Sequence, residues 1–165
     1  MSRGILIRHS TTEFPGRGRP DAARVRYGID TIVETGTFNG LGTASFASGH
    51  GFGSIQGRPP RRVYTIELDP DLHATASRRF ESWPNVVALR GDSAAELPRL
   101  LTNASEIHTL ATSEDPVCFY LDSHYSGGGT AACGGPKRGG PHELPRAFAV
   151  LLAPIASTRL CVLAA

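Results

Sequence analysis

The chain has 165 residues, and 17 Lys and Arg against 15 Asp and Glu give a formal net charge of +2. A hydrophobic share of 40% with 19% charged residues argues against a disordered chain and a polybasic nucleic-acid tail. The length is one domain's worth of chain, and it is short for a complete enzyme of most α/β families. We therefore expect one folded domain, and nucleic acid is not an expected partner.

The apolar stretches are too short for a membrane span. Residues 148–153, among the longest, fall far below the roughly 20 residues that a spanning helix needs. The first ten residues hold too short an apolar stretch for a signal peptide. Cys118, Cys133 and Cys161 are odd in number and lack CxxC spacing, which predicts neither a disulfide framework nor a zinc ribbon. We expect a cytoplasmic protein with no membrane partner.

The N-terminal segment, residues 1–26, differs in composition from the rest of the chain. It carries six arginines, two prolines and three glycines without sustained periodicity, which predicts a loose arm leading into a helical stretch near residues 21–27. Arginines can contact phosphate, but Phe14 is the only aromatic residue among them, so we interpret the segment as a solvated leader. The domain itself is expected over residues 27–165.

From residue 31 onward, short β-branched runs alternate with helical stretches. The expected strands are residues 31–34, 62–67, 86–89, 117–121 and 160–163. The expected helices are residues 41–48, 71–82, 94–101 and 143–152. Because strands that alternate with helices form βαβ units, the sequence predicts an α/β fold with a parallel sheet and right-handed crossovers.

Capping signals mark the start of two of these helices. Asp69 stands where an N-cap belongs, with Pro70 at the first helical position. Ser93 and Glu96 form an S-x-x-E capping box, which predicts that Ser93 caps the third helix.

The segment VETGTFNGLGTA, residues 33–44, joins the first expected strand to the first helix. Its glycines at positions 36, 40 and 42 let the backbone approach a ligand and turn tightly into a helix. The spacing G-x-x-x-G-x-G does not match the G-x-G-x-x-G fingerprint of dinucleotide-binding proteins, and the G-K-[ST] of a P-loop is absent. Pyrophosphate binding is therefore disfavoured.

Acidic residues end three consecutive expected strands: Glu34, Glu67 and Asp92. A carboxylate at Glu67 can accept hydrogen bonds from both hydroxyls of a ribose, although Glu67 follows Gly40 by 27 residues where about 20 is usual. The polar insertion at residues 49–60 accounts for the excess. Asp92 stands where a side chain could meet an adenine amino group. Each acid alone is as well explained as a helix cap or turn former, but the three together favour a ligand with a nucleoside and an amino-acid part.

Four motifs carry a resemblance to a known family. They read YGIDTIVETGTFNG from Tyr27, YTIELD from Tyr64, GDS from Gly91 with LPRLL after it, and LDSHYSGGGT from Leu121. As a set they resemble the class I S-adenosylmethionine-dependent methyltransferases, and the resemblance spans residues 21–163. VETGT alone would be a weak signal.

This resemblance implies a Rossmann-like, doubly wound parallel sheet with strand order 3-2-1-4-5. The cofactor S-adenosylmethionine would lie across the carboxyl ends of the strands, at the topological switch point. The residues implied in cofactor binding are, for the methionine part, Glu34, Gly36, Thr37, Phe38 and Gly40; for the ribose, Glu67 with Leu68 after it; and near the adenine, Asp92 and Ser93.

Asp122 and His124 follow the fourth expected strand as D-x-H, near where the methyl group would point. Methyl transfer depends mainly on in-line positioning, and only an acceptor hydroxyl needs deprotonation. We therefore predict His124 as a general base and Asp122 as its orienting or acceptor-binding acid. Some relatives hold a divalent metal at this strand end, but only one carboxylate is present there, so no metal site is expected.

The chain departs from the family after the fifth expected strand. Class I methyltransferases ordinarily add a hairpin of strands 6 and 7, and this hairpin is expected to be missing here. Residues 160–163 would then form an exposed apolar edge, which soluble proteins avoid. Either a second copy of the chain covers that edge in a homodimer, or the chain is a fragment or a divergent copy.

The sequence thus leads to two functional hypotheses. The first is an S-adenosylmethionine-dependent methyltransferase acting on a small-molecule or saccharide-like acceptor, and it rests on the four strand-end motifs together. The alternative is a truncated or inactive cofactor-binding Rossmann module without catalytic activity, and it rests on the missing C-terminal strands.

Overall fold

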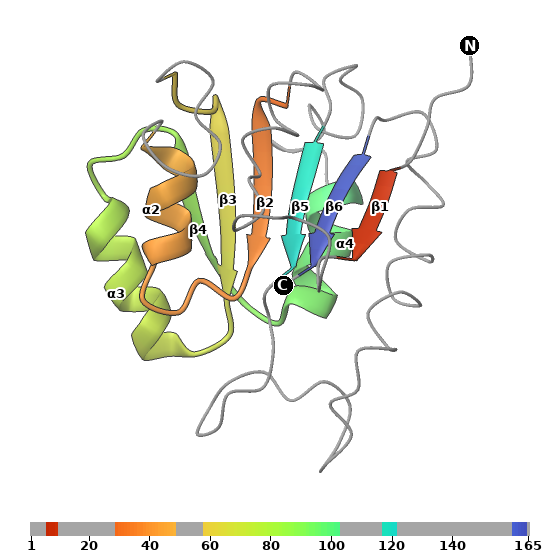
Figure 1. The fold of residues 1–165 in the computed structure, drawn as a ribbon. Helices are drawn as coiled ribbons and strands as arrows, with labels where there is room; N and C mark the ends of the chain where they lie inside the picture. The colour runs from red at the N-terminus through yellow and green to blue at the C-terminus, as the bar shows by residue number, and fades with distance from the viewer. Residues whose placement is uncertain (1–5, 10–28, 49–57, 103–116, 122–159, 165) are drawn as a thin grey trace.

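The structure is a computed structural model that describes residues 6–9, 29–48, 58–102, 117–121 and 160–164. These residues form an α/β fold with one parallel sheet (Figure 1). Its strands are β1 (Leu6–His9), β2 (Thr31–Thr35), β3 (Arg62–Glu67), β4 (Val86–Arg90), β5 (Val117–Leu121) and β6 (Leu160–Ala164). Its helices are α2 (Leu41–Ala47), α3 (Pro70–Phe80) and α4 (Ser93–Thr102). Among the described residues, no helix combines the length and the apolar character that crossing a membrane requires.

The sheet has the strand order β1-β6-β5-β2-β3-β4, and each neighbouring pair is parallel. The predicted α/β class with a parallel sheet is confirmed, and the four strands β4-β3-β2-β5 follow the predicted order 3-2-1-4. The chain changes direction across the sheet at β2, which lies between β3 and β5. In register, Glu34 of β2 lies opposite Thr65 of β3 and Tyr120 of β5. Helix α4 lies behind the sheet in the view of Figure 1.

Strand β1 is a difference from the sequence prediction. Residues 1–26 are predicted to be a loose arm, yet Leu6–His9 pairs in parallel with β6, and Leu6 lies opposite Cys161. The edge of β6 that the sequence leaves exposed is therefore paired within the same chain. The sequence of β1, LIRH, shows neither the period-two alternation nor the continuous apolar run by which strands are recognised. The helices predicted near residues 21–27 and at 143–152 lie outside the described residues.

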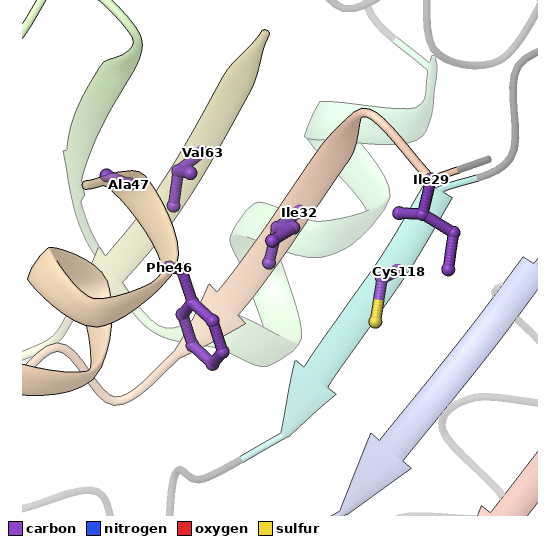
Figure 2. Packing of buried hydrophobic residues seen from close by; sticks show 6 residues of the cluster. All are labelled: Ile29, Ile32, Phe46, Ala47, Val63 and Cys118. Carbon is purple, nitrogen blue, oxygen red and sulfur yellow. The ribbon is translucent and has the colours of Figure 1, made fainter. Parts of the chain in front are cut away.

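The core is built around the central strands, which are buried on both faces. All five residues of β2 are buried, and so are five of the six residues of β3. Such strands read as continuous β-branched and apolar runs, which is the pattern expected of a covered parallel sheet. Figure 2 shows one cluster in which α2 packs on this sheet; its members are Ile29, Ile32, Phe46, Ala47, Val63 and Cys118.

The turn after α3 carries the chain's single tryptophan. Trp83 packs edge-on against Phe80, with ring centroids 5.5 Å apart and an interplanar angle of 80°. Trp83 also packs against the cluster of Figure 2 and is half-buried. Phe80 is the last residue of α3 and is buried, so this pair fixes the carboxyl end of the helix to the core.

Two predicted helix caps have different outcomes. The prediction for α3 is confirmed: the Asp69 carboxylate accepts from the backbone N–H of Asp71 (2.8 Å) and of Leu72 (3.0 Å), and Pro70 is the first helical residue. The prediction that Ser93 caps α4 is wrong. Asp92 takes that role, as its Oδ1 accepts from the Ala94 N–H at 2.9 Å. Its backbone carbonyl also accepts from Glu96, at 2.8 Å. The Asp92 carboxylate satisfies the orphan N–H of Ala94, so the helix begins at Ser93, one residue earlier than the capping box implies.

Candidate functional site

The loop of residues 36–40 connects β2 to α2 at the carboxyl end of the sheet. Gly40, the N-cap of α2, has a φ of 75°, in the left-handed region that side chains rarely adopt. A Cβ placed on Gly40 would lie 2.9 Å from the Phe80 ring. Glycine is therefore required at this position, both by the turn and by the contact between the loop and α3.

Backbone hydrogen bonds hold this loop against β3. The N–H groups of Gly36 and Thr37 both donate to the carbonyl oxygen of Ile66, at 2.9 and 3.3 Å. The Gly40 N–H donates to the Thr37 carbonyl at 2.8 Å, which closes a tight turn. On the outer side, the Arg79 guanidinium donates to the carbonyl oxygen of Asn39 at 2.8 Å. The loop is thus tied to both β3 and α3.

Glu67, the last residue of β3, links the strand ends around it. Its Oε2 accepts from the Phe38 N–H at 2.7 Å, and its Oε1 accepts from the Asp69 N–H at 3.0 Å. Its backbone carbonyl accepts from the Gly91 N–H at 2.9 Å, in the turn after β4. Glu67 therefore joins the loops that follow β2, β3 and β4, and only 6% of its surface is exposed.

The loops after β2 and β3, which the Glu67 carboxylate joins, carry exposed apolar side chains. Phe38 is 58% exposed, and Leu68, which follows Glu67, is 38% exposed. Leu41, at the start of α2, is exposed as well. Phe38 also has a positive φ of 49°, which is uncommon for a bulky residue outside a turn or a strained site. The loop thus exposes an aromatic ring while its backbone N–H is bound to Glu67.

Glu34, by contrast, faces the interior. It is 2% exposed, and its Oε2 accepts from the hydroxyls of Thr43 (2.5 Å) and Thr65 (2.8 Å). A carboxylate this deeply buried requires hydrogen-bond donors around it, and the threonines of α2 and β3 supply them. The structure thus surrounds the Glu34 side chain with the protein's own groups.

The remaining predicted contacts are spread over the same edge of the sheet. Thr37 is buried, and its hydroxyl lies 2.6 Å from that of Thr65. Asp92 is exposed at the end of β4, and Ser93 is the half-buried first residue of α4. The structure therefore brings Phe38, Glu67 and Leu68 together, while Thr37 points into the fold.

The predicted catalytic pair, Asp122 and His124, lies outside the described residues, directly after β5. β5 ends at Leu121, which is opposite Thr35 of β2. Within the described ranges, no group of three or more His, Cys, Asp or Glu side chains is arranged to hold a metal ion.

Sequence reasoning missed two residues of this region, Thr43 and Thr65, and it interpreted Gly42 as a glycine for ligand approach and the turn, not as space for the Glu34 carboxylate. Thr43 and Thr65 bind the Glu34 carboxylate, and a Cβ on Gly42 would lie 2.5 Å from Glu34 Oε1. The pairing of Thr65 with Glu34 follows from the register of β2 and β3, which strand boundaries alone do not fix. The one sequence signal of a buried group at this point is Gly42 itself, because alanine is normally favoured within the first turn of a helix.

Compared with models of known protein families, the chain matches none. No curated protein matches it either. The functional hypothesis therefore rests on the motifs of the chain and on the geometry of the strand ends.

Proposed function

We propose that this chain is an S-adenosylmethionine-dependent methyltransferase of the class I type. In this proposal the domain is Rossmann-like with strand order 3-2-1-4-5, works in the cytoplasm and methylates a small-molecule or saccharide-like acceptor. The observation that carries the proposal is the position of Glu67, which joins the loops after β2, β3 and β4 at the carboxyl edge of a parallel sheet. Ligands of open α/β sheets bind at this edge, beside the point where the strand order reverses.

The residues at this edge fit a nucleoside. A carboxylate has about four acceptor positions, and backbone N–H groups occupy one on each oxygen of Glu67, so acceptor positions remain for two ribose hydroxyls. Leu68 offers apolar surface next to this carboxylate, and Asp92 is exposed at the end of the neighbouring strand. Glu67, Leu68 and Asp92 are therefore the residues we propose to hold the adenosine part.

S-adenosylmethionine supplies an electrophilic methyl group on a sulfonium, so the protein's main task is to hold acceptor and donor in line. The loop of residues 36–40, tied to β3 and α3, restricts the backbone beside the methionine part. For a hydroxyl acceptor, His124 would take the proton and Asp122 would orient the imidazole. These two roles stay predictions from the sequence.

The proposal is tested by isothermal titration of the full chain with S-adenosylhomocysteine. We expect the wild type to bind and Glu67→Ala to bind at least tenfold more weakly, because charge-assisted hydrogen bonds contribute about 1.5–3 kcal/mol each. Glu81→Ala is the matched control, since Glu81 is exposed at the other end of α3. Circular dichroism confirms that each variant is folded.

Absence of binding by the wild type, or equal affinity of Glu67→Ala, would refute the cofactor assignment. Binding without methyl transfer to any member of an acceptor panel would favour the alternative, a cofactor-binding module without activity. Methyl transfer from radiolabelled S-adenosylmethionine distinguishes these two cases.

A further inference from the structure

The buried side of the 36–40 loop contains a chain of hydroxyl groups that ends on a carboxylate. Thr65 Oγ1 donates to Glu34 Oε2 at 2.8 Å, and Thr37 Oγ1 lies 2.6 Å from Thr65 Oγ1. An ionised Glu34 carboxylate takes the single hydroxyl proton of Thr65, and Thr37 is then the donor in the second contact. The hydrogen bonds therefore run in one direction, from Thr37 through Thr65 to Glu34.

The same carboxylate also fixes the first turn of α2. Thr43 Oγ1 donates to Glu34 Oε2 at 2.5 Å, and Thr43 Oγ1 lies 3.3 Å from that of Thr65. Thr37 and Thr43 lie on either side of Gly40, so the loop is anchored on both sides to a single buried acid. All three threonines and Glu34 are buried, with exposed fractions of 3% or less.

We propose that Thr65 is a positioning residue which, with Glu34, sets the shape of the ligand-facing loop from inside the fold. Thr65 lies on a different strand from the loop, 28 residues from Thr37 and 31 from Glu34. Its hydroxyl contacts both the Thr37 hydroxyl of the loop and the Glu34 carboxylate. Its effect on ligand binding rests on the proposed function, while its effect on the loop does not.

This role explains the acid of the VETGT motif without a direct contact to a ligand. Glu34 is enclosed by Thr43 and Thr65, and Gly42 lies so close to Oε1 that a Cβ would approach it to 2.5 Å. A carboxylate enclosed in this way acts on the loop through the two hydroxyls that it accepts. The outer face of the loop, where the Phe38 N–H meets Glu67, receives its position from these inner contacts.

The test compares three variants of the full chain: Thr65→Val, Thr65→Ser and Thr31→Val. Valine keeps the shape of threonine and removes the hydroxyl, whereas serine keeps the hydroxyl. Thr31 is the matched control, because it is 1% exposed and lies at the opposite end of β2 from the loop. Chemical denaturation first establishes the global stability of each variant.

The first measurement is amide hydrogen exchange of residues 36–41 without ligand. Hydrogen bonds protect the amides of Gly36, Phe38 and Gly40, so a released loop exchanges faster. We expect Thr65→Val to accelerate this exchange at least tenfold beyond any change in global stability. Thr65→Ser and Thr31→Val should stay within about threefold of the wild type. Unchanged loop exchange in Thr65→Val, or an equal acceleration in Thr31→Val, overturns the positioning role.

The second measurement is the affinity for S-adenosylhomocysteine. We expect Thr65→Val to bind at least tenfold more weakly, with recovery to within threefold in Thr65→Ser. If the wild type does not bind while loop exchange responds as expected, the proposed function fails and the loop-shaping role of Thr65 stands. If the wild type and Thr65→Val bind equally, the cofactor assignment survives and the role of Thr65 in binding is overturned.

Discussion

At the scale of single residues, Gly42 leaves room for the Glu34 carboxylate because glycine has no side chain. Gly42 lies in the first turn of α2, where an ordinary helix gains stability from alanine. Here the Cβ of an alanine would lie 2.5 Å from Glu34 Oε1, on a carboxylate that two threonines hold in place. The need to accommodate this buried carboxylate therefore outweighs helix propensity at this position.

We expect Gly42→Ala to lower the free energy of unfolding by about 1–3 kcal/mol, the usual cost of overpacking. Propensity alone predicts the opposite sign, a gain of about 1 kcal/mol. Urea denaturation followed by circular dichroism measures the change. Ala95→Gly, at an exposed position in the first turn of α4, is the control and should lose no more than about 1 kcal/mol. A stabilised Gly42→Ala would show that Glu34 moves aside without cost.

At the scale of secondary-structure elements, the helices that follow β3 and β4 are each capped at the N-terminus by an aspartate. Asp69 accepts two backbone N–H bonds and precedes a proline that is preorganised for the first turn. Asp92 accepts one, from Ala94. These two acids therefore stabilise α3 and α4 from the same edge of the sheet that carries the candidate site.

Replacing these caps should destabilise the fold in a definite order. We expect Asp69→Ala to cost about 1–2 kcal/mol and Asp92→Ala about 1 kcal/mol, because the first loses two hydrogen bonds to orphan N–H groups and the second loses one. Ser93→Ala should cost less than Asp92→Ala. Guanidinium denaturation of the three variants measures the order. A larger loss for Ser93→Ala would restore the capping box that the sequence predicts.

The elements could be predicted from the sequence to the extent that their signals are local. Strand β3 and strand β5 have the predicted bounds, because strands buried on both faces read as continuous apolar and β-branched runs between turn residues. The hydroxyl chain below the loop could not be predicted in the same way. It joins positions 9, 28 and 31 residues apart, and their contact depends on the register of neighbouring strands.

At the scale of the whole molecule, the sheet is unequally covered. The strands β2 and β3 are buried and paired on both sides, whereas β4 ends the sheet and its residues are half-buried or exposed. Stability in a domain is not uniform, and the elements with the most buried contacts open only in global unfolding. Glu34 and Glu67 of the candidate site thus belong to strands that are buried and paired on both sides.

We expect native-state hydrogen exchange to reflect this arrangement. The amides of Ile32 to Glu34 and of Val63 to Ile66 should exchange only through global unfolding. The amides of β4, at the sheet's edge, should exchange through a smaller opening with a lower free energy. NMR exchange measured over a series of low denaturant concentrations separates the two classes. If β4 exchanged as slowly as β2, the sheet would have to continue or be covered beyond β4.

The position of the only tryptophan has an optical consequence. Trp83 packs on Phe80, and the Phe80 ring lies directly against Gly40 at the end of the 36–40 loop. A change in the shape of this loop therefore alters the surroundings of an indole two side chains away. Because no other tryptophan contributes to the signal, the intrinsic fluorescence of the native chain reports on its own candidate binding edge without any introduced label.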